Sequence, residues 1–384
     1  MARILFLSDR YPPDAGGVSA SAARIASTLA SLGNQVDAVA WTRALHAGQV
    51  APQEGNPAAY RVGRFRGWDS TMPHTLNLLD WLWSMGPYDL VWGHYLSLAG
   101  FLSVWFGRLH GVRSVVSIRG NDLDRDIFPP GDIARLEWTL RHADSVTAVT
   151  LDLARKAQAL SGREDVLHLP NVVDTAIFSP DAPGAPADRA RLGIAPDEAV
   201  LAFCGELREK KGLPYLLEAL AAVRKVRPAR LLIIGDVRPS EMPHLLQMLG
   251  PAPLEQHHIA ITGQLPDPAA VNAHLQLCDV YLQPSLWDGM PNALLEAMAA
   301  GCGAIASDAG GIPEIITPGL DGIIVPRWQL HRLGEAVLEW LAAAPEHRGA
   351  VRKAARRRML TGFALDGERK ALQKLLAGLI PSSR

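Results

Sequence analysis

The stretch YLQPSLWDGMPNALLEAMAAGCGAIASDAGGIPE, residues 281–314, decides the fold of this chain. An apolar run ends at Pro284-Ser285, and an acidic turn follows at Asp288-Gly289. A short helical segment then carries Glu296, and a second apolar run leads to Gly310-Gly311. This pattern predicts a strand, a loop, a helix, a strand and a glycine loop in that order. Such an order places a ligand at the carboxyl ends of parallel strands.

The start of the helical segment has the chemistry of an anion site. Pro291 fits the opening turn of a helix, where its missing N–H leaves no bond unmade. The backbone amides from Gly289 to Asn292 would then be unpaired donors that attract phosphate. Asp288 before the helix and Glu296 inside it are separated by about 12 Å or less. The alternative is an ordinary αβ unit in which both carboxylates are solvated.

Length and composition describe an ordinary globular chain with more than one domain. The 384 residues are 48% hydrophobic and 20% charged, and the formal net charge is −1. A chain of this length forms at least two cores, and a charge near zero argues against nucleic acid as a partner. Three cysteines, Cys204, Cys278 and Cys302, lie far apart without a CxxC pair. This spacing favours a reducing compartment and argues against a metal site.

Neither the start of the chain nor its longest apolar stretch predicts export or membrane insertion. Residues 2–8 enter an apolar strand directly, without the layout of a signal peptide. The longest apolar stretch, residues 90–106, approaches membrane-spanning length, but His94 and the glycines within it favour a buried strand followed by a helix. We therefore expect a cytoplasmic protein, either free or in peripheral contact with the inner face of the membrane.

The first half opens with a βαβ pattern. Residues 2–8 predict a strand, residues 18–32 show helical apolar spacing, and residues 36–41 predict the next strand. Gly16-Gly17 lies where the first strand gives way to the helix, which is where an open α/β sheet binds ligands. The pair does not belong to a GxGxxG pattern. It is interpreted either as a plain turn or as a phosphate contact.

Two further segments of the first half carry arginine. Residues 61–85 combine arginines with aromatic residues. This composition is typical either of an exposed strand and an amphipathic helix, or of a surface that meets lipid headgroups or an apolar acceptor. The predicted strand at residues 112–118 ends in Arg119, whose forked guanidinium suits an anion. Pairing of Arg119 with Asp122 or Asp124 is the alternative.

The second half repeats the alternation of strands and helices after a linker rich in proline and alanine at residues 179–190. Arg208 and Lys211 lie in a basic loop after its first strand. Cationic side chains at the carboxyl end of a strand suit a diphosphate, and a solvated loop of mixed charge is the alternative. We predict an α/β protein of two doubly wound Rossmann-like domains that face a central cleft.

Together these motifs resemble the retaining glycosyltransferases of the GT-B fold, in particular the family 4 group that uses nucleotide sugars. The similarity covers the whole chain and is most specific in residues 281–314. The family pattern there has two acidic residues flanking seven others, followed by EAMA-G, an S/T-D pair and GG-x-P-E. The matching residues are Asp288, Glu296-Ala297-Met298-Ala299, Gly301, Ser307-Asp308, Gly310-Gly311 and Pro313-Glu314.

The resemblance implies roles for individual residues. Glu296 would hydrogen-bond the ribose of the donor nucleotide, and Asp288 would meet the transferred sugar. PNVVD at residues 170–174 is similar to a PNGVD segment on the hinge side of the family fold. The other residues implied to bind the donor are Lys211, Arg208, Gly16, Gly17, Gly289, Met290, Pro291 and Asn292.

Three positions depart from the family pattern. The first acidic residue is usually Glu and is Asp288 here. The arginine that usually follows the glycine of GRL is replaced by Glu206, so Arg208 would take its place. A histidine common before Gly-x-D is Arg119, which leaves His94 and Arg119 as catalytic candidates near the reacting carbon, beside Asp288.

The implied reaction is retaining transfer of a hexose from a nucleotide-diphosphate sugar, UDP- or GDP-linked, to a glycan, lipid-linked or small-molecule acceptor. In the family the departing diphosphate helps to deprotonate the acceptor, so we expect no protein nucleophile, no metal and no further cofactor. Two alternatives remain. One is a sugar-nucleotide epimerase of the same fold, motivated by Asp288, and the other is a non-catalytic relative, motivated by Glu206 and Arg119.

The expected domains are an acceptor-side domain at residues 1–178 and a nucleotide-sugar-binding domain at residues 191–362. A C-terminal helix at residues 363–384 is expected to pack back on the first domain. The last part of the chain, from residue 346 onward, carries a large excess of Lys and Arg over Asp and Glu.

Within this basic tail Arg348, Arg352 and Arg356 recur every four residues and so form one helix face. The face is interpreted either as solvated or as a surface that approaches an anionic membrane carrying the acceptor.

Overall fold

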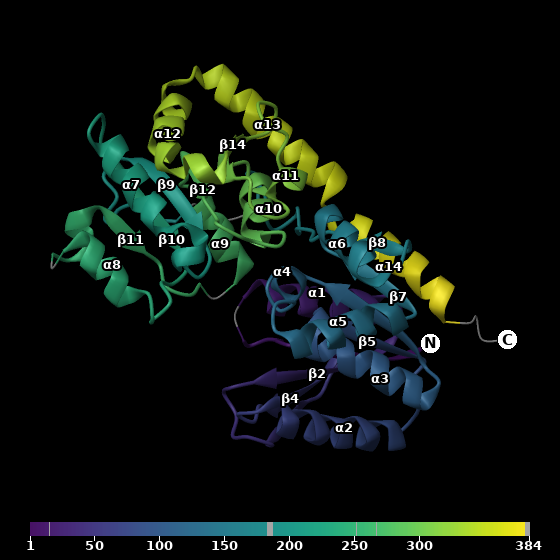
Figure 1. Cartoon of the computed structure of the whole chain (residues 1–384). Coiled ribbons are helices and arrows are strands. Elements are labelled where there is room, and N and C mark those ends of the chain that lie inside the picture. Colours follow the sequence, from purple (N-terminus) through teal and green to yellow (C-terminus); the bar gives the residue numbers. More distant parts are fainter. Residues whose placement is uncertain (15, 183–186, 251, 266, 381–384) are drawn as a thin grey trace. The chain divides into compact units, whose positions relative to one another are not determined.

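The chain forms two compact units, Met1–Pro170 with Glu368–Arg384, and Asn171–Gly367. Each unit holds one doubly wound, mainly parallel sheet, which confirms the predicted α/β class with two Rossmann-like halves (Figure 1). The computed structural model describes residues 1–14, 16–182, 187–250, 252–265 and 267–380.

The division between the units differs from the boundary drawn at residue 178. Asn171 already belongs to the second unit, where its side-chain amide donates to the carbonyl of Met290 at 2.7 Å. Ser179, at the start of the expected linker, donates its backbone N–H to Asn272 at 3.2 Å. Of that linker, residues 183–186 lie outside the described part of the chain.

The first unit is built around an eight-stranded sheet of order β3-β4-β2-β1-β5-β6-β7-β8. All neighbouring strands are parallel except β3, which is antiparallel to β4. The strand order reverses between β1 and β5, and ligands bind at such a switch point. The elements are β1 (Arg3–Ser8), α1 (Gly17–Ser31), β2 (Gln35–Thr42), β3 (Val50–Gln53), β4 (Ala58–Gly63), α2 (Trp68–Ser84), β5 (Leu90–His94), η1 (Leu96–Gly100), α3 (Phe101–His110), β6 (Arg113–Ile118), α4 (Asn121–Asp124), α5 (Pro130–His142), β7 (Ser145–Ala148), α6 (Leu151–Ser161), β8 (Val166–His168) and α14 (Leu365–Leu379).

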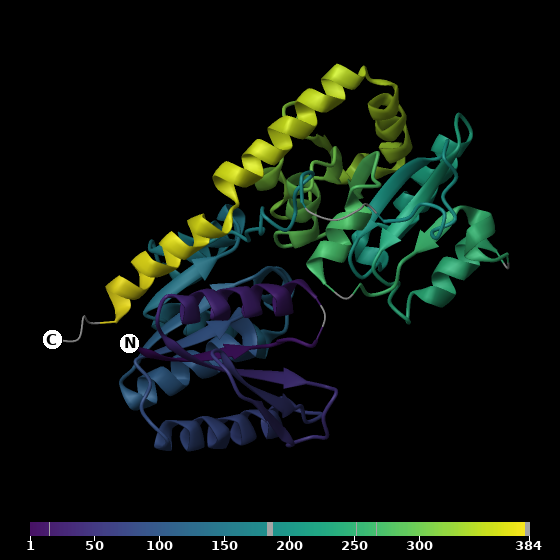
Figure 2. The same ribbon diagram turned by 180° about the vertical axis from the view of Figure 1, so that it is seen from behind.

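Helices cover both faces of this sheet, so its central strands are buried along almost their whole length. On one face Ile25 of α1 and Leu372 of α14 share a core with Phe6 of β1. Figure 2 shows α14 running beside α1. On the other face Leu79 of α2 and Phe106 of α3 share a second core. These two layers fix the carboxyl ends of β1 and β5.

The second unit has a six-stranded, fully parallel sheet of order β11-β10-β9-β12-β13-β14. Its order reverses between β9 and β12. The elements are β9 (Ala199–Cys204), η2 (Glu209–Lys211), α7 (Leu213–Arg224), β10 (Ala229–Ile234), α8 (Met242–Leu249), η3 (Leu254–His257), β11 (Ile259–Ile261), α9 (Pro268–Leu275), β12 (Val280–Gln283), α10 (Asn292–Ala299), β13 (Ala304–Ser307), α11 (Ile312–Ile315), β14 (Ile323–Val325), η4 (Arg327–Arg332), α12 (Leu333–Ala342) and α13 (Pro345–Gly362).

The core of the second unit forms where α7 and α12 pack on the sheet. Leu216 and Leu220 of α7 and Val337 and Trp340 of α12 are buried against Leu201 of β9. The apolar spacing that predicts the helix at α7 therefore marks the face that it buries. This packing holds β9 and the loop after it in place beside β12.

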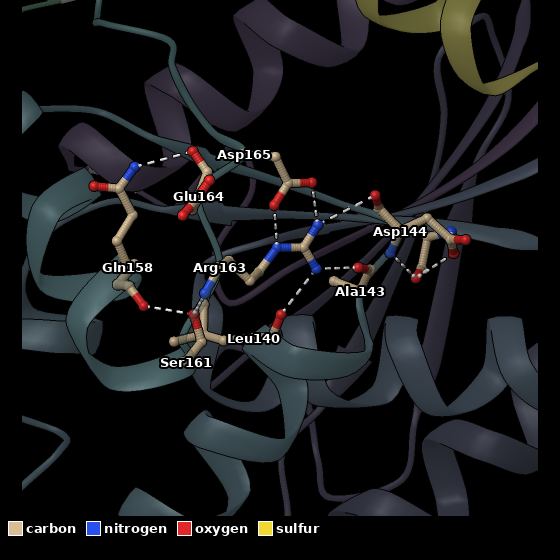
Figure 3. Close-up of polar contacts among 10 residues, drawn as sticks. Leu140, Ala143, Asp144, Gln158, Ser161, Arg163, Glu164 and Asp165 are labelled. Carbon is tan, nitrogen blue, oxygen red and sulfur yellow. Dashed lines mark hydrogen bonds and ion pairs between the residues drawn. The ribbon is translucent and has the colours of Figure 1, made fainter.

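A half-buried arginine closes the end of one helix of the first unit (Figure 3). Arg163 donates to the carbonyls of Leu140 and Ala143 at the end of α5, where carbonyls lack partners within the helix. Asp165 holds the guanidinium through bonds of 2.8 and 2.6 Å. These bonds fix the turn between α5 and β7, at the amino end of β7.

The basic face of α13 packs against backbone carbonyls of the second unit, whereas a solvated or membrane-facing surface was expected. Arg352 donates to the carbonyl of Asp279 at 2.7 Å, and Arg356 donates to the carbonyl of Ala299 at 2.7 Å. Arg348 on the same face is half-buried. The expectation of a solvated or membrane-facing surface is therefore wrong for Arg352 and Arg356, because their guanidinium groups satisfy backbone carbonyls of their own unit.

Replacing Arg356 with alanine is expected to lower the free energy of unfolding by about 2–3 kcal/mol, because buried carbonyls lose their donor. Besides Ala299, the guanidinium bonds the carbonyl of Thr175 at 2.8 Å. Urea denaturation provides the measurement. Arg357→Ala removes the neighbouring exposed arginine and is expected to change the stability by less than about 0.5 kcal/mol. Equal effects of the two substitutions would contradict the assignment.

The apolar stretch at residues 90–106 forms β5, η1 and the first half of α3, as the strand-and-helix prediction has it. Among the described residues no helix combines the length and the apolar character needed to cross a membrane.

Candidate functional site

Two loops of the second unit meet at its switch point, one after β9 and one after β12. Leu286 donates its backbone N–H to the carbonyl of Lys210 at 2.9 Å. Next to this contact the ammonium group of Lys211 forms an ion pair with the carboxylate of Asp288. The structure therefore joins two residues that the sequence analysis assigned separately to the diphosphate and to the sugar.

The carboxylate of Asp288 is held in its charged form. Burial acts to raise the pKa of Asp288, but the ammonium groups of Lys211 and Lys210 and a hydrogen bond from Ser285 outweigh it and lower the pKa. Ser285 Oγ lies 3.3 Å from the carboxylate. Asp288 thus offers ionised oxygens in an enclosed setting, where they interact strongly with a nearby ligand.

Glycine allows these loops to approach one another closely. Gly310 has φ +51°, and a Cβ there would lie 1.7 Å from the carbonyl oxygen of Asp288. Gly212 has φ +84°, and its Cβ would lie 2.1 Å from the carbonyl oxygen of Pro284. Gly311 donates to the carbonyl of Gly289 at 2.6 Å, so the glycine turn after β13 supports the acidic loop directly.

The segment before α10 is anchored rather than open. Pro291 stands one residue before the first helical residue, not in the opening turn as predicted. Gly289 donates its backbone N–H to the carboxylate of Asp288 at 3.1 Å, so this amide is not the free donor that was expected. Asn171 holds Met290. The backbone N–H of Asn171 lies 3.3 Å from the sulfur of Met290, and the side-chain amide of Asn171 donates to the Met290 carbonyl.

Asn171 is a structural residue that the sequence analysis named only through its PNVVD segment. Its contact with Met290 spans a long stretch of chain, so no local pattern reveals it. The PNVVD segment and the DGMPN loop fold together because Asn171 donates twice to Met290. Its side-chain amide bonds the carbonyl, and its backbone N–H contacts the sulfur.

Glu296 lies in the middle of α10 and is half-buried. Its charge reaches two groups of the sheet below. Burial raises the pKa of the Cys204 thiol, and the negative charge of Glu296 adds to the rise. The pKa of Tyr281 is likewise raised by burial, with Glu296 among the contributing charges. Glu296 therefore lies near the last residue of β9, at the carboxyl edge where the ribose is predicted.

Arg208 shares its charge with a neighbouring acid. Its guanidinium lies 3.3 Å from Glu206, the residue that replaces the usual arginine. Glu206 also accepts a hydrogen bond of 2.7 Å from Arg238. The departure at Glu206 thus comes with two arginines around it, and Lys211 is the cation that faces Asp288.

His94 is enclosed in the first unit. It has no exposed surface, and its Nε2 lies 2.9 Å from the hydroxyl of Ser21 on α1. Burial lowers the pKa of His94 well below its usual value, and the positive charges of Arg119 and Arg24 lower it further. The ring is therefore neutral. Its other nitrogen, Nδ1, is enclosed without a hydrogen-bond partner among the described residues.

Arg119 lies close to His94 at the end of β6. Its side chain is almost fully buried, and burial together with the charge of Arg24 lowers its pKa to about 10. Glu368 of α14 opposes this effect and forms an ion pair of 3.0 Å with Arg24. The last helix thus supplies the acid that balances two arginines of the first unit.

Asp122, one of the two partners expected for Arg119, contacts the backbone of Arg119. Asp122 accepts hydrogen bonds from the backbone N–H groups of Arg119 at 2.9 Å and Gly120 at 2.6 Å. Asp124, the other expected partner, instead pairs with Lys156 at 2.7 Å. Burial raises the pKa of Asp122 to about 6, against the lowering effect of these amides. Asp122 therefore shapes the turn that presents Arg119.

Gly16-Gly17 lies at the start of α1, where the strand-to-helix handover was predicted. Gly16 has φ +129°, and its carbonyl accepts the N–H of Ala20 at 3.0 Å. Asp14 ties this loop to the end of β2 by accepting a bond of 3.0 Å from Thr42. The loop is thus fixed beside the carboxyl edge of the sheet, and its contact with a phosphate stays a prediction.

Asp9 is a candidate that the sequence analysis missed. It follows β1 directly, and its Oδ1 is enclosed without a hydrogen-bond partner among the described residues. Burial, reinforced by the charge of Asp122, raises the pKa of Asp9 to about 7. The available signal was the acidic residue placed immediately after the first buried strand, at the edge where ligands bind.

Asp9→Asn is expected to alter the pH dependence of stability. Because the pKa of Asp9 is raised, the folded protein holds a proton that the unfolded chain has lost. The wild type should therefore lose stability relative to Asp9→Asn as the pH rises from about 4 to about 7, by about 3 kcal/mol. Urea titrations at several pH values measure this. Asp197→Asn, at an exposed position, is the control, and parallel curves for Asp9→Asn and wild type would contradict the prediction.

Within the described ranges, no group of three or more His, Cys, Asp or Glu side chains is arranged to hold a metal ion.

Two family models match this chain. One, described as glycosyl transferases group 1, matches residues 198–343, and the other, described as a glycosyl transferase 4-like domain, matches residues 16–172. The first match covers β9 to α12 with the Lys211–Asp288 pair and Glu296. The second covers α1 to β8 of the first unit and includes His94 and Arg119.

The chain is also similar to individual proteins of this kind. It is 26% identical to a D-inositol 3-phosphate glycosyltransferase of Arthrobacter sp. (strain FB24), over 92% of this chain and 90% of that protein. It is 27% identical to a GDP-mannose-dependent alpha-(1-6)-phosphatidylinositol monomannoside mannosyltransferase of Mycolicibacterium smegmatis, over 98% of both. The solved structure of a sucrose-phosphate synthase from Thermosynechococcus elongatus has the same fold, with a TM-score of 0.80, 18% identity and full coverage of both chains.

Proposed function

Because the chain is a glycosyltransferase that belongs to the glycosyl transferases group 1 family, we propose that it moves a hexose from a nucleotide-diphosphate sugar to an acceptor with retained anomeric configuration. The acceptor is a glycan, a glycolipid or a small molecule. The observation that carries the proposal is the enclosed pair of Lys211 and Asp288 beside Glu296 at the carboxyl edge of β9 and β12.

In the proposed donor complex the diphosphate binds where positive charge gathers in the second unit. Lys211 and Arg208 contribute side-chain cations, and the first turn of α10 contributes its positive dipole end. Glu296 accepts hydrogen bonds from the ribose hydroxyls, because an ionised carboxylate is an acceptor only. The donor is a UDP- or GDP-sugar. The relative from Mycolicibacterium smegmatis is a GDP-mannose-dependent enzyme, which supports a GDP-sugar as a candidate donor.

The ion pair suggests how the donor sugar is engaged. An arriving diphosphate competes with Asp288 for the ammonium group of Lys211. As the charge of Lys211 is drawn to the phosphate, an oxygen of Asp288 becomes available to a hydroxyl of the transferred sugar. Ser285 still donates to the carboxylate of Asp288 when Lys211 has turned to the phosphate, and Asp288 thus takes the role of the longer glutamate.

No protein nucleophile is needed in this proposal. As the bond between the sugar and the diphosphate breaks, the leaving oxygens gain charge that Lys211 and Arg208 stabilise. The acceptor hydroxyl attacks from the same face and passes its proton to the departing phosphate. The proposal assigns Arg119 of the first unit to the reacting carbon, as the resemblance implies, and leaves to neutral His94 no role in proton transfer.

A sugar-nucleotide epimerase and a non-catalytic protein are the second candidates. The epimerase releases a product that still carries its nucleotide, whereas the transferase releases a free nucleoside diphosphate. A panel of UDP-, GDP-, ADP- and dTDP-sugars distinguishes them, because a bound donor raises the melting temperature. Release of UDP or GDP, with proton NMR of the product showing the donor's anomeric configuration, is the expected result. An inverted product would contradict retention.

We place the protein in the cytoplasm, with peripheral contact at the inner membrane face as a property of the acceptor step. The relative from Mycolicibacterium smegmatis, a phosphatidylinositol monomannoside mannosyltransferase, supports this. Arg352 and Arg356 of α13 do not contribute, because they bond backbone carbonyls. Sedimentation with anionic vesicles, compared with neutral ones, tests the contact.

A further inference from the structure

Three arginines of the first unit stand at the carboxyl ends of three adjacent strands. Arg10 follows β1, Arg43 follows β2, and Arg64 follows β4. These strands are neighbours in the sheet and run parallel, so their carboxyl ends meet at one edge. We call Arg10, Arg43 and Arg64 the arginine edge. Only Arg64 belongs to the stretch at residues 61–85 that the sequence analysis singled out, and nothing in the donor scheme uses the arginine edge.

The register of the sheet brings two of these residues directly side by side. Thr42, the last residue of β2, pairs with Gly63, the last residue of β4. The ladder continues one step further, because Arg64 donates its backbone N–H to the carbonyl of Thr42 at 3.0 Å. Arg43 and Arg64 therefore begin their loops at the spacing of neighbouring strands, about 5 Å apart. Like charges placed opposite one another in this way destabilise a sheet.

Little in the described structure offsets this charge. No carboxylate of the described residues forms an ion pair with any member of the arginine edge. Arg64 instead lies over the ring of Trp68, 3.7 Å from its centroid. Partial burial lowers the pKa of Arg64, the charges of Arg43 and Arg10 lower it further, and Asp9 alone among the nearby acids opposes them. The members of the arginine edge are thus close enough to repel one another.

We propose that the arginine edge binds an anionic group of the acceptor, a phosphate ester in particular. This inference rests on the proposed glycosyl transfer and specifies its acceptor. Guanidinium groups form paired hydrogen bonds with phosphate oxygens, and several of them around one phosphate turn mutual repulsion into attraction. A phosphate bound there would lie at the same edge of the sheet as Asp9, which follows β1 directly. Asp14 also lies at this edge, because it accepts a hydrogen bond of 3.0 Å from Thr42, the neighbour of Arg43.

The acceptor proposal requires that the arginine edge does not contact the donor diphosphate. Lys211 and Arg208, which the donor diphosphate uses, belong to the second unit, and the arginine edge belongs entirely to the first. Substitutions in the arginine edge should therefore weaken acceptor binding without changing the affinity for UDP or GDP. This separation distinguishes an acceptor site from a second contact with the donor.

The test measures binding of phosphorylated and unphosphorylated probes to the full chain, with UDP or GDP present. Myo-inositol 1-phosphate is compared with myo-inositol, and glucose 6-phosphate with glucose. At least one phosphate ester is expected to bind more tightly than its parent. Arg43→Ala and Arg64→Ala are each expected to weaken that binding by about tenfold. Arg66→Ala removes an exposed arginine of the same loop and should leave it unchanged.

A second arm separates the sources of the phosphate. Phosphatidylcholine vesicles with phosphatidylinositol are compared with pure phosphatidylcholine vesicles. Binding to the first kind only, lost in Arg43→Ala and Arg64→Ala, identifies a lipid headgroup as the phosphate source. Binding of the soluble esters only identifies a small-molecule acceptor. Both results support the arginine edge as the phosphate site.

The proposal is overturned if neither soluble esters nor phosphatidylinositol vesicles bind better than their uncharged counterparts, or if the arginine variants bind them as the wild type does. Affinity for UDP or GDP, measured on every variant, shows that the chain is folded. A wild type that binds neither UDP nor GDP is a different outcome. It would refute the proposed donor site, whereas the comparison of phosphate esters with their unphosphorylated parents would still test the arginine edge.

Discussion

Replacing Lys211 with alanine is expected to lower kcat/KM for the nucleotide sugar by about 10²–10³-fold. The substitution removes the enclosed cation that faces Asp288, and with it the charge that stabilises the leaving diphosphate. It also leaves the carboxylate of Asp288 without its partner, so the free energy of unfolding should fall by about 3 kcal/mol. Steady-state kinetics and urea denaturation measure the two effects.

The double variant Lys211→Ala/Asp288→Asn separates these effects. It removes the uncompensated charge together with the cation, so most of the lost stability should return. Activity should stay low, because the diphosphate still lacks its cation. Recovery of activity along with stability would mean that Lys211 only holds the loop, and the role assigned to it in the chemistry would be wrong.

Gly310→Ala is expected to be the most damaging single substitution in the donor loop. A Cβ at this position would lie 1.7 Å from the carbonyl oxygen of Asp288, so the acidic loop would have to move. The added φ strain and the clash together should lower the free energy of unfolding by about 3 kcal/mol or more. Nucleotide binding should be lost as well, because the loop carries Asp288 and leads into α10.

Gly319→Ala provides the matched control. Gly319 also has a left-handed backbone, with φ +79°, but a Cβ there meets open space. Its substitution should cost only the backbone strain of about 1 kcal/mol and leave nucleotide binding intact. Circular dichroism melts and calorimetric titration of UDP and GDP give the comparison. Equal losses for the two glycines would show that backbone strain alone, and not contact with Asp288, determines the effect.

The order of strands and helices was predictable, because buried parallel strands appear as short apolar runs and their helices as longer periodic ones. The handover at Gly16-Gly17 and the basic loop that holds Lys211 were both found where the structure has them. These features depend on a few neighbouring residues. The pairing of Lys211 with Asp288 did not follow from such patterns, because it depends on which strands become neighbours in the sheet.

The basic face of α13 shows a second limit of sequence patterns. Spacing of four residues correctly places Arg352 and Arg356 on one side of a helix. It does not say what that side meets, and in the structure it meets the carbonyls of Asp279 and Ala299. An arginine that satisfies the end of another helix has the same sequence signature as one that meets water.

Asp9 was missed for a related reason. The pKa of Asp9 is raised by burial and by the charge of Asp122, and a hydrogen bond from the backbone of Ala99 opposes the rise; both residues are distant from Asp9 in the chain. Sequence position alone marks it as a loop residue after β1. Only the assembled edge of the sheet brings it together with Arg64 and gives it a setting that alters its proton affinity.

The account's central claim is that the second unit binds a nucleotide sugar with Glu296 on its ribose. Calorimetric titration of UDP- and GDP-sugars into the wild type and Glu296→Ala tests it most directly. We predict that the wild type binds at least one of them and that Glu296→Ala weakens this binding by about 1–3 kcal/mol. Glu218→Ala, at an exposed position on α7, should bind as the wild type does. Unchanged affinity in Glu296→Ala, or no binding of any nucleotide sugar by the wild type, would contradict the claim.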